Sequence, residues 1–181
     1  MSLNLEEIKR ARDEADCLAD ETTVEAALDR MAAEITARLA DANPLVYAVM
    51  NGALIFAGRI LPRLPFPLEV AYLHATRYGH AIQGTLLDWR VRPTQDLRGR
   101  TVLVLDDILD EGETMAAIRE KVLGMGAKSF YSAVFANKLI DKVKPIKADF
   151  VGLDVPNRYV FGYGMDVRGA WRNLPAIYAL K

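Results

Sequence analysis

Three carboxylates gather where an apolar stretch of the chain ends. Asp106 and Asp107 follow the apolar residues 102–105, Asp110 comes three positions later, and Gly112 and Thr114 complete the segment. Carboxylates accept hydrogen bonds from hydroxyl groups and bind Mg²⁺. A glycine turn that opens a helix presents free N–H groups and the positive end of the helix dipole to an anion. Acids beside such a turn predict a sugar phosphate with a cis-diol and a metal ion as the ligand.

Other interpretations of this segment explain less of it. No Lys-Ser/Thr pair follows the glycine and no G-x-G-x-x-G pattern occurs, which argues against nucleoside triphosphatases and dinucleotide-binding proteins. An acid pair after a strand also occurs in Mg²⁺-binding receiver domains and in phosphatases, but here it lies past mid-chain and a glycine turn follows. The alternative without a function is a group of solvated acids at a strand end. Three neighbouring carboxylates repel one another, which makes this alternative less favourable.

Alternating apolar runs predict the elements that position this segment. Strands are expected at residues 45–50, 68–74, 101–105, 130–136, 150–153 and 159–161, and helices at 53–64 and 115–123. Short continuous apolar runs are typical of strands buried on both faces. Strand, helix and strand in succession predict parallel pairing through right-handed crossovers. The fold class is therefore α/β, and the acids lie beyond the carboxyl end of a strand, where such sheets bind ligands.

Two segments depart from this alternation. Residues 1–40 are expected to be an N-terminal helical extension, because Thr22 and Glu25 have capping-box spacing and apolar residues then recur every three or four positions. Residues 76–99 have no helical period, but apolar and polar residues alternate in their second half. The alternation predicts a two-stranded arm or lid. Loops of this length inside a compact domain are usually functional or mobile.

Composition excludes several classes of protein. The 181 residues carry 23 basic and 24 acidic side chains, and 51% are apolar, which is typical of one globular domain and gives no reason to expect nucleic-acid binding. The single Cys17 excludes a disulfide framework and agrees with a cytoplasmic location; on an expected helix, it is predicted to be inert packing. No stretch predicts a membrane span, and the acidic N-terminus does not resemble a signal peptide.

The acidic segment resembles the phosphoribosyl-pyrophosphate (PRPP) signature of type I phosphoribosyltransferases. Residues 50–53 resemble the pyrophosphate loop of the hypoxanthine-guanine phosphoribosyltransferases, residues 149–166 their purine hood, and residues 172–175 their C-terminal end. The resemblance covers roughly residues 41–181. It implies the type I phosphoribosyltransferase fold, a central, mostly parallel sheet flanked by helices in one domain spanning residues 1–181. A flexible lid or arm at 76–99 and a small hood at 149–181 complete the expected architecture.

The resemblance implies a role for each residue of the PRPP segment. Asp106 and Asp107 would bind the ribose hydroxyls and help to place Mg²⁺. Asp110 would face the purine N7 as general base and would stabilise positive charge at the anomeric carbon. Backbone N–H groups, with the Thr114 hydroxyl, would hold the 5′-phosphate along a turn formed by Glu111, Gly112, Glu113 and Thr114.

Residues outside this segment would bind the purine. Lys138 would donate to the 6-oxo group, Tyr159 would stack on the base, and Val160 would offer backbone groups to its edge. For Lys138 the alternative is a solvated lysine at a strand end, and for the other two it is core strand. A donor at the 6-oxo position rejects a 6-amino purine, because the ammonium would face another donor.

Pyrophosphate and metal contacts complete the set that the resemblance implies. Asn51, Gly52 and Arg172 would bind pyrophosphate, since a guanidinium group suits an anion with paired oxygens. Asp166 would be a metal-associated carboxylate beside Asp106 and Asp107. For Arg172 alone, a surface salt bridge is the alternative.

The sequence departs from the family pattern in three places. Glu111 stands where relatives often carry Thr or Ser, so it and Glu113 are expected to point away from the phosphate. Asn51 stands where some relatives carry Lys. The lid has Arg77 and Tyr78 where many relatives have a Ser-Tyr pair, and Arg77 is a candidate for anion contact during lid closure.

The resemblance implies an enzyme of purine salvage. It would transfer the 5-phosphoribosyl group from PRPP to N9 of hypoxanthine or guanine, yielding IMP or GMP and pyrophosphate, with Mg²⁺ as cofactor. Its partners would be small-molecule substrates and a second copy in a homodimer or homotetramer, with no nucleic acid or membrane. The alternative is a regulator on the same fold that senses PRPP and binds nucleic acid. Such a module should have a basic face, whereas the basic residues here are spread along the chain.

Overall fold

A six-stranded sheet forms the centre of the computed structural model, which describes residues 4–77 and 87–181. In spatial order its strands are β4 (Leu87–Val91), β3 (Glu69–Arg77), β2 (Leu45–Val49), β5 (Thr101–Leu109), β6 (Ser129–Lys138) and β7 (Phe150–Val155). Strands β3, β2, β5, β6 and β7 pair in parallel, and β4 pairs antiparallel to β3. The expected α/β class and the mostly parallel sheet are confirmed.

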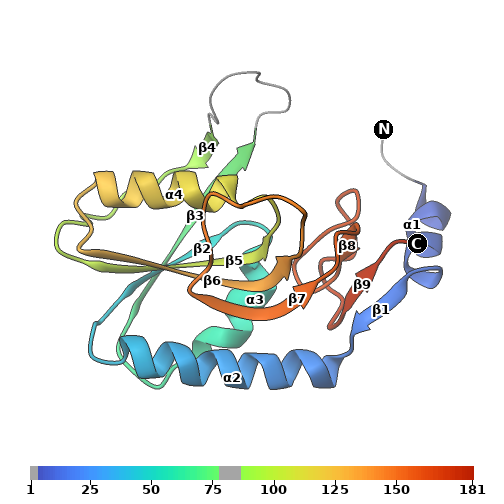
Figure 1. Ribbon diagram of the computed structural model, residues 1–181, viewed down its shortest axis with the longest axis horizontal. Coiled ribbons are helices and arrows are strands. Elements are labelled where there is room, and N and C mark those ends of the chain that lie inside the picture. The colour runs from blue at the N-terminus through green and yellow to red at the C-terminus, as the bar shows by residue number, and fades with distance from the viewer. Residues whose placement is uncertain (1–3, 78–86) are drawn as a thin grey trace.

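Helices cover both faces of this sheet (Figure 1). Helix α4 (Glu113–Gly124) lies on one face, and α2 (Glu21–Leu39) and α3 (Ala53–Ile60), which the 3₁₀ turn η1 (Leu61–Arg63) extends, lie on the other. All five residues of β2 are buried, as a strand covered on both faces requires. Two apolar clusters result, one between the sheet and α2 and α3, the other between the sheet and α4.

The beginning of α2 differs from the prediction. Asp20 is the N-cap, and its carboxylate accepts a hydrogen bond from the Thr23 N–H at 2.9 Å. Thr22 lies inside the helix, so the capping box predicted with Glu25 was wrong. An aspartate two residues earlier satisfies the same free N–H groups, because Asp accepts at an N-cap as well as Thr does. The predicted apolar face of the helix is confirmed, because Leu28, Met31 and the other apolar residues that recur every three or four positions are buried.

A second, three-stranded antiparallel sheet forms the hood beside the carboxyl ends of β5 and β6 (Figure 1). Its order is β1 (Asp16–Ala19), β9 (Ile177–Ala179) and β8 (Val160–Phe161), and helix α1 (Leu5–Asp13) precedes it. The N-terminal extension was expected to be helical, but β1 is a strand that completes the hood. Cys17 lies exposed on this strand, so its predicted packing in a helix was wrong.

The expected arm begins at the edge of the main sheet. Strand β4 is its second strand and pairs with the last four residues of β3. Tyr78 lies outside the described residues, and Arg77 is described only as the last residue of β3. Within residues 4–77 and 87–181, no helix has the length and apolar character needed to cross a membrane.

Candidate functional site

Strand β5 carries two of the three acids inside the sheet. It continues to Leu109, and its residues Asp106 and Ile108 still pair with Val134 and Ala136 of β6. The prediction that the strand ends at residue 105 was therefore wrong by four residues. Successive side chains of a strand point to opposite faces, so Asp106 and Asp107 leave β5 on different sides, and only Asp110 lies in the turn.

Burial works against the ionised forms of both strand acids. The pKa of Asp106 is raised well above the ordinary 3.8, first by burial and then by the charge of Asp107. Burial also raises the pKa of Asp107, and the nearby guanidinium of Arg172 offsets part of that effect. Two adjacent carboxyl groups that lose water and repel each other are stabilised by a cation or by hydroxyl donors.

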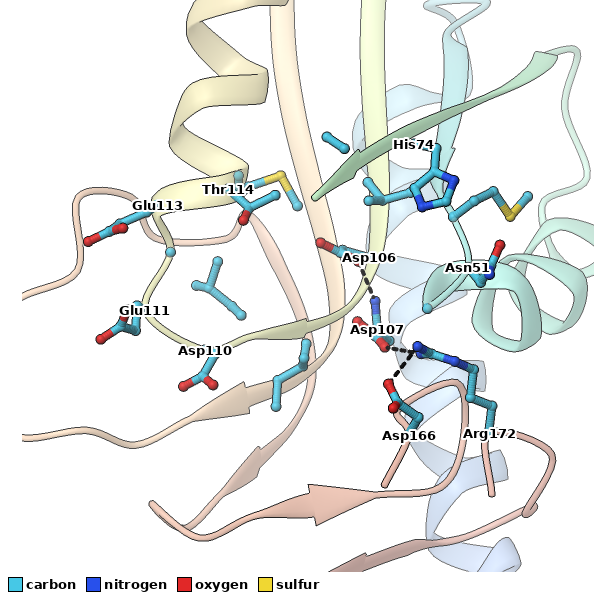
Figure 2. A pocket seen from close by; sticks show the side chains of 18 of the residues that line it. Asn51, His74, Asp106, Asp107, Asp110, Glu111, Glu113, Thr114, Asp166 and Arg172 are labelled. Carbon is cyan, nitrogen blue, oxygen red and sulfur yellow. Dashed lines mark hydrogen bonds and ion pairs between the residues drawn. The ribbon is translucent and has the colours of Figure 1, made fainter. Parts of the chain in front are cut away.

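Arg172 joins the hood to this pair of acids. Its Nη2 lies 2.5 Å from Oδ1 of Asp166 and its Nη1 lies 3.8 Å from Oδ2 of Asp107 (Figure 2). Nη1 also donates to the carbonyl oxygen of Gly164 at 2.6 Å. The arginine is thus held by three oxygens at the rim of a cavity. The alternative interpretation, a single surface salt bridge, accounts for only part of these contacts.

Two glycines allow the loop after β2 to touch the hood. Gly52 lies so close to Asp107 that an added Cβ would be 2.3 Å from Oδ2 of that carboxylate. At Gly164, where φ is +101°, a Cβ would be 2.2 Å from the carbonyl oxygen of Gly52. The preceding peptide bond, Met50–Asn51, is cis. Neither glycine can carry a side chain without moving this loop, which faces the acids of β5.

The turn after β5 ends at the N-terminus of α4. Gly112 is the N-cap with a φ of 84°, and no side chain caps the helix. The first N–H groups of the helix are therefore available to an anion. Figure 2 shows Glu111 and Glu113 directed away from Asp106 and Arg172, as expected from their charge.

Lys138 and Asp110 form an ion pair beside this turn. Nζ of Lys138 lies 2.9 Å from Oδ2 of Asp110, and the side chains are 13% and 51% exposed. Lys138 is the last residue of β6, the strand next to β5. The alternative interpretation of a solvated lysine at a strand end is wrong, since the side chain is largely buried and paired.

The other two residues expected at the base lie in the hood. Tyr159 is 51% exposed and its hydroxyl donates to the carbonyl oxygen of Asp166 at 3.2 Å. Val160 is buried on β8. The core-strand alternative is therefore confirmed for Val160 and wrong for Tyr159, which is exposed and lies just before β8.

One cavity of about 540 Å³ collects most of these groups. Its lining includes eleven predicted site residues: Asn51, Gly52, Asp106, Asp107, Asp110, Glu111, Gly112, Glu113, Thr114, Asp166 and Arg172. Lys138, Tyr159 and Val160 do not line it, although Lys138 reaches it through Asp110. His74 and Arg90, which the sequence reasoning missed, do line it. The position of His74 near the carboxyl end of a parallel strand was the available signal, whereas Arg90 is brought in by the antiparallel pairing of β4.

No three acidic, histidine or cysteine residues among those described are arranged to hold a metal ion by themselves. Asp166 pairs closely with Arg172, whereas Asp107 lies 3.8 Å from the same guanidinium, so Asp106 and Asp107 are the adjacent, largely buried carboxylates best placed to bind a cation. Mg²⁺ is usually bound through one or two carboxylates together with substrate phosphates. This donor set therefore fits a magnesium ion that enters with a phosphorylated substrate.

The parallel sheet thus brings an acid pair, a helix N-terminus and a loop with two closely packed glycines to one cavity, as the sequence predicted for a site of the phosphoribosyltransferase type. The phosphoribosyl transferase domain family model matches residues 14–168. The chain is 33% identical over 168 residues to the hypoxanthine-guanine phosphoribosyltransferase of Bacillus subtilis, with 91% of this chain and 92% of that protein covered. It belongs to the phosphoribosyltransferase family, and within it to the group of hypoxanthine-guanine phosphoribosyltransferases.

Two further comparisons agree with this assignment. A solved hypoxanthine-guanine-xanthine phosphoribosyltransferase superposes with a TM-score of 0.84 at 30% identity, covering 93% of this chain and 99% of that one. A bifunctional TilS/HprT protein of Listeria innocua is 34% identical over 168 residues, which are 91% of this chain. The chain spans only 26% of that longer relative.

Proposed function

We propose that this protein transfers the 5-phosphoribosyl group of PRPP to N9 of hypoxanthine or guanine, giving IMP or GMP and pyrophosphate in purine salvage. The observation that carries the proposal is the pair of Lys138 and Asp110, 2.9 Å apart. In guanine, and equally in hypoxanthine, O6 and N7 are neighbouring groups on one edge of the base. An ammonium donor beside a carboxylate acceptor matches a 6-oxo group beside a protonated N7.

The sugar and its phosphate would lie across the acid segment. Asp106 and Asp107 are suited to the two ribose hydroxyls, and the N–H groups from Glu111 to Thr114 to the 5′-phosphate. Support comes from the uncapped N-terminus of α4 and from the outward direction of both glutamates. An anion at that position interacts favourably with the helix dipole.

Pyrophosphate would lie between the loop at Asn51 and Gly52 and the guanidinium of Arg172. Asp106, Asp107 and Asp166 would hold Mg²⁺ together with phosphate oxygens of the substrate. When bound, the ion neutralises charge on the departing pyrophosphate. The close packing of Gly52 against Asp107 supports this arrangement, since it brings the loop backbone next to the acid pair.

In the reaction, N9 of the base forms a bond to the anomeric carbon of PRPP while the bond from that carbon to the pyrophosphate oxygen breaks, with inversion. The proton leaves N7 of the base and passes to the carboxylate of Asp110. Lys138 must leave Asp110 to donate to O6, so binding of a 6-oxo purine frees the carboxylate that accepts the proton. Tyr159 would stack on the base and Val160 would contribute backbone groups at its edge.

Base specificity tests this proposal. Hypoxanthine and guanine should be substrates, and adenine should be rejected by a factor of about 10³ or more, because its amine leaves a desolvated ammonium without an acceptor. In Lys138→Gln, kcat/KM for hypoxanthine should fall and the discrimination against adenine should relax, since an amide both donates and accepts. Lys128→Gln is the control, because Lys128 is an exposed lysine at the opposite end of β6. An unchanged hypoxanthine-to-adenine ratio in Lys138→Gln contradicts the role of this lysine.

We also propose that the protein forms a homodimer or homotetramer through β3. Val70 and Tyr72 are 58% and 54% exposed. They point to the sheet face on which α3 packs against β2 and β5, because they pair with Val46 and Ala48 of the core cluster there. A second copy would cover this apolar face. Light scattering should give a multimer for the wild type and for the control Leu123→Glu, and a monomer for Tyr72→Glu. A monomeric wild type would contradict the proposal.

A further inference from the structure

The loop that joins β6 to β7, residues 139–149, packs against the outer side of the substrate turn. Lys142 of this loop pairs with Glu111, and Lys144 reaches the end of β5. Lys138, the residue immediately before the loop, pairs with Asp110. Three lysines from one short segment thus contact the turn that follows β5, although only Lys138 has a place in the proposed chemistry.

Lys144 makes two hydrogen bonds at the ends of β5 and β6. Its Nζ donates to the carbonyl oxygen of Leu109 at 2.6 Å and to Oδ1 of Asn137 at 2.8 Å. Asn137 in turn donates through Nδ2 to Oδ1 of Asp154 on β7, at 2.7 Å. One ammonium therefore connects the ends of β5 and β6, and an amide extends the connection to β7.

The environment of this ammonium is partly desolvated. Burial lowers the pKa of Lys144, while the charges of Asp110 and Asp154 act in the opposite direction. Removing water from a charged amine is unfavourable unless acceptors replace the water. Here a main-chain carbonyl and a side-chain amide do so, which makes the group costly to lose without replacement.

The base of the Lys144 side chain lies beside the other end of the turn. A Cβ built on Gly112 would lie 3.4 Å from Cβ of Lys144 and 3.4 Å from Cδ of Pro145. Lys144 therefore binds the chain at Leu109 and lies close to it at Gly112. Between these two points lie Asp110 and the first N–H groups of the phosphate-binding turn.

We propose that Lys144 is a positioning residue that fixes Asp110, Lys138 and the phosphate turn in their working geometry. The two residues that its ammonium binds, Leu109 and Asn137, directly precede Asp110 and Lys138 in the chain. A displacement at either strand end moves one partner of the base-binding pair relative to the other. This role rests on the proposed phosphoribosyl transfer, in which those groups contact both substrates.

The test replaces the ammonium while keeping the length of the side chain. Lys144→Met should raise the KM for PRPP about tenfold and lower kcat for hypoxanthine by a similar factor, because small displacements of catalytic groups cost large factors in rate. Lys147→Met, at an exposed lysine of the same loop, is the matched control and should change neither constant more than about twofold. Lys144→Gln keeps an N–H donor, so its KM for PRPP and its kcat should lie between those of the other two variants. It replaces Lys144→Met in the test if that variant does not fold.

Chemical rescue separates the ammonium from general packing. In a Cys17→Ser background the chain has no other cysteine, so Lys144→Cys can be alkylated with 2-bromoethylamine to a side chain of nearly the same length and charge as lysine. The KM for PRPP should return to within about threefold of the background value.

Two results have separate meanings. Wild-type turnover of hypoxanthine with PRPP tests the proposed function alone, and its absence overturns that proposal. With turnover established, an unchanged KM for PRPP in Lys144→Met overturns the positioning role. A loss that aminoethylation of Lys144→Cys fails to restore also overturns it, because packing alone would then explain the effect.

Discussion

Two groups of acids within five residues of one segment, Asp106 with Asp107 and Asp110 alone, have opposite surroundings. Asp106 and Asp107 lie in β5, where burial raises both pKa values and the charge of Asp107 further raises that of Asp106. Asp110 lies past the end of the strand, half-exposed and paired with Lys138. The strand pair has only a distant cation, since Arg172 lies 3.8 Å from Asp107 and is shared with Asp166, whereas Asp110 has Lys138 at 2.9 Å.

This difference shows how one residue type serves two purposes. Buried carboxylates that repel each other are poised to bind a ligand carrying positive charge or donors. A carboxylate with a replaceable partner is poised to accept a proton once a substrate takes that partner away. The end of β5 at Leu109 separates the two groups. The backbone of Asp106 and Asp107 belongs to the sheet, whereas Asp110 lies beyond it and pairs with Lys138 through its side chain.

The largest effect is expected when the carboxylate of Asp110 loses its charge. Asp110→Asn should lower kcat by about 10²–10⁴-fold, the usual cost of losing a general base, while the affinity for PRPP changes little. The phosphate would still be held mainly by backbone N–H groups. Steady-state kinetics and calorimetric titration with PRPP measure the two quantities, and near-wild-type turnover would exclude Asp110 from the chemistry.

A change in the hood tests whether the strand acids depend on the loop that faces them. Gly164→Ala should lower kcat/KM by about 10²-fold, because the new Cβ meets the Gly52 carbonyl and φ is positive there. Gly58→Ala is the matched control, since a Cβ at that position of α3 has open space. Equal kinetics for the two variants would show that the contact between loop and hood has no part in catalysis.

Removing the strand pair should have the converse effect to Asp110→Asn. In Asp106→Ala with Asp107→Ala, the dissociation constant of PRPP should rise about tenfold or more and its dependence on Mg²⁺ concentration should flatten. The reason is that each lost charge-assisted hydrogen bond is worth about 1.5–3 kcal/mol. Unchanged PRPP binding by calorimetry would refute the assignment of the ribose and metal contacts to these acids.

The smallest effect concerns stability without ligand. Because both strand acids have raised pKa values, the folded chain binds their protons more tightly than the unfolded chain, and stability falls as pH rises from below 3.8 through those values. Asp106→Asn should therefore raise Tm at pH 7 by about 2–4 °C, the shift that about 1 kcal/mol gives in a chain of this size.

Asp110→Asn is the control for this stability change. Its carboxylate is half-exposed and paired with Lys138, so its loss should not raise Tm. Calorimetric scans at pH 5 and pH 7 compare the three proteins, and the gain in Asp106→Asn should be smaller at pH 5. A Tm of Asp106→Asn below that of the wild type at pH 7 would contradict the stated cost of the buried charge.

The main sheet and its helices could be predicted because each element carries its own pattern. The buried residues of β2 form a continuous apolar run, and α2 repeats its apolar residues at helical spacing. Strands β1 and β9 were missed because they are short and their pairing partners lie at opposite ends of the chain. Pairing of that kind leaves no local period, so it cannot be recognised from either segment alone.

The sequence by itself determined the α/β class, the acid segment and the kinds of group that meet there, because these depend on residue type and local spacing. Only the tertiary structure decided which partners those groups have. It extended β5 through both acids, paired Lys138 with Asp110 and joined Lys144 to the ends of two strands. The physical reason is that burial and ion pairing arise between residues distant along the chain, and their strength depends on distances and solvent exclusion that local patterns do not encode.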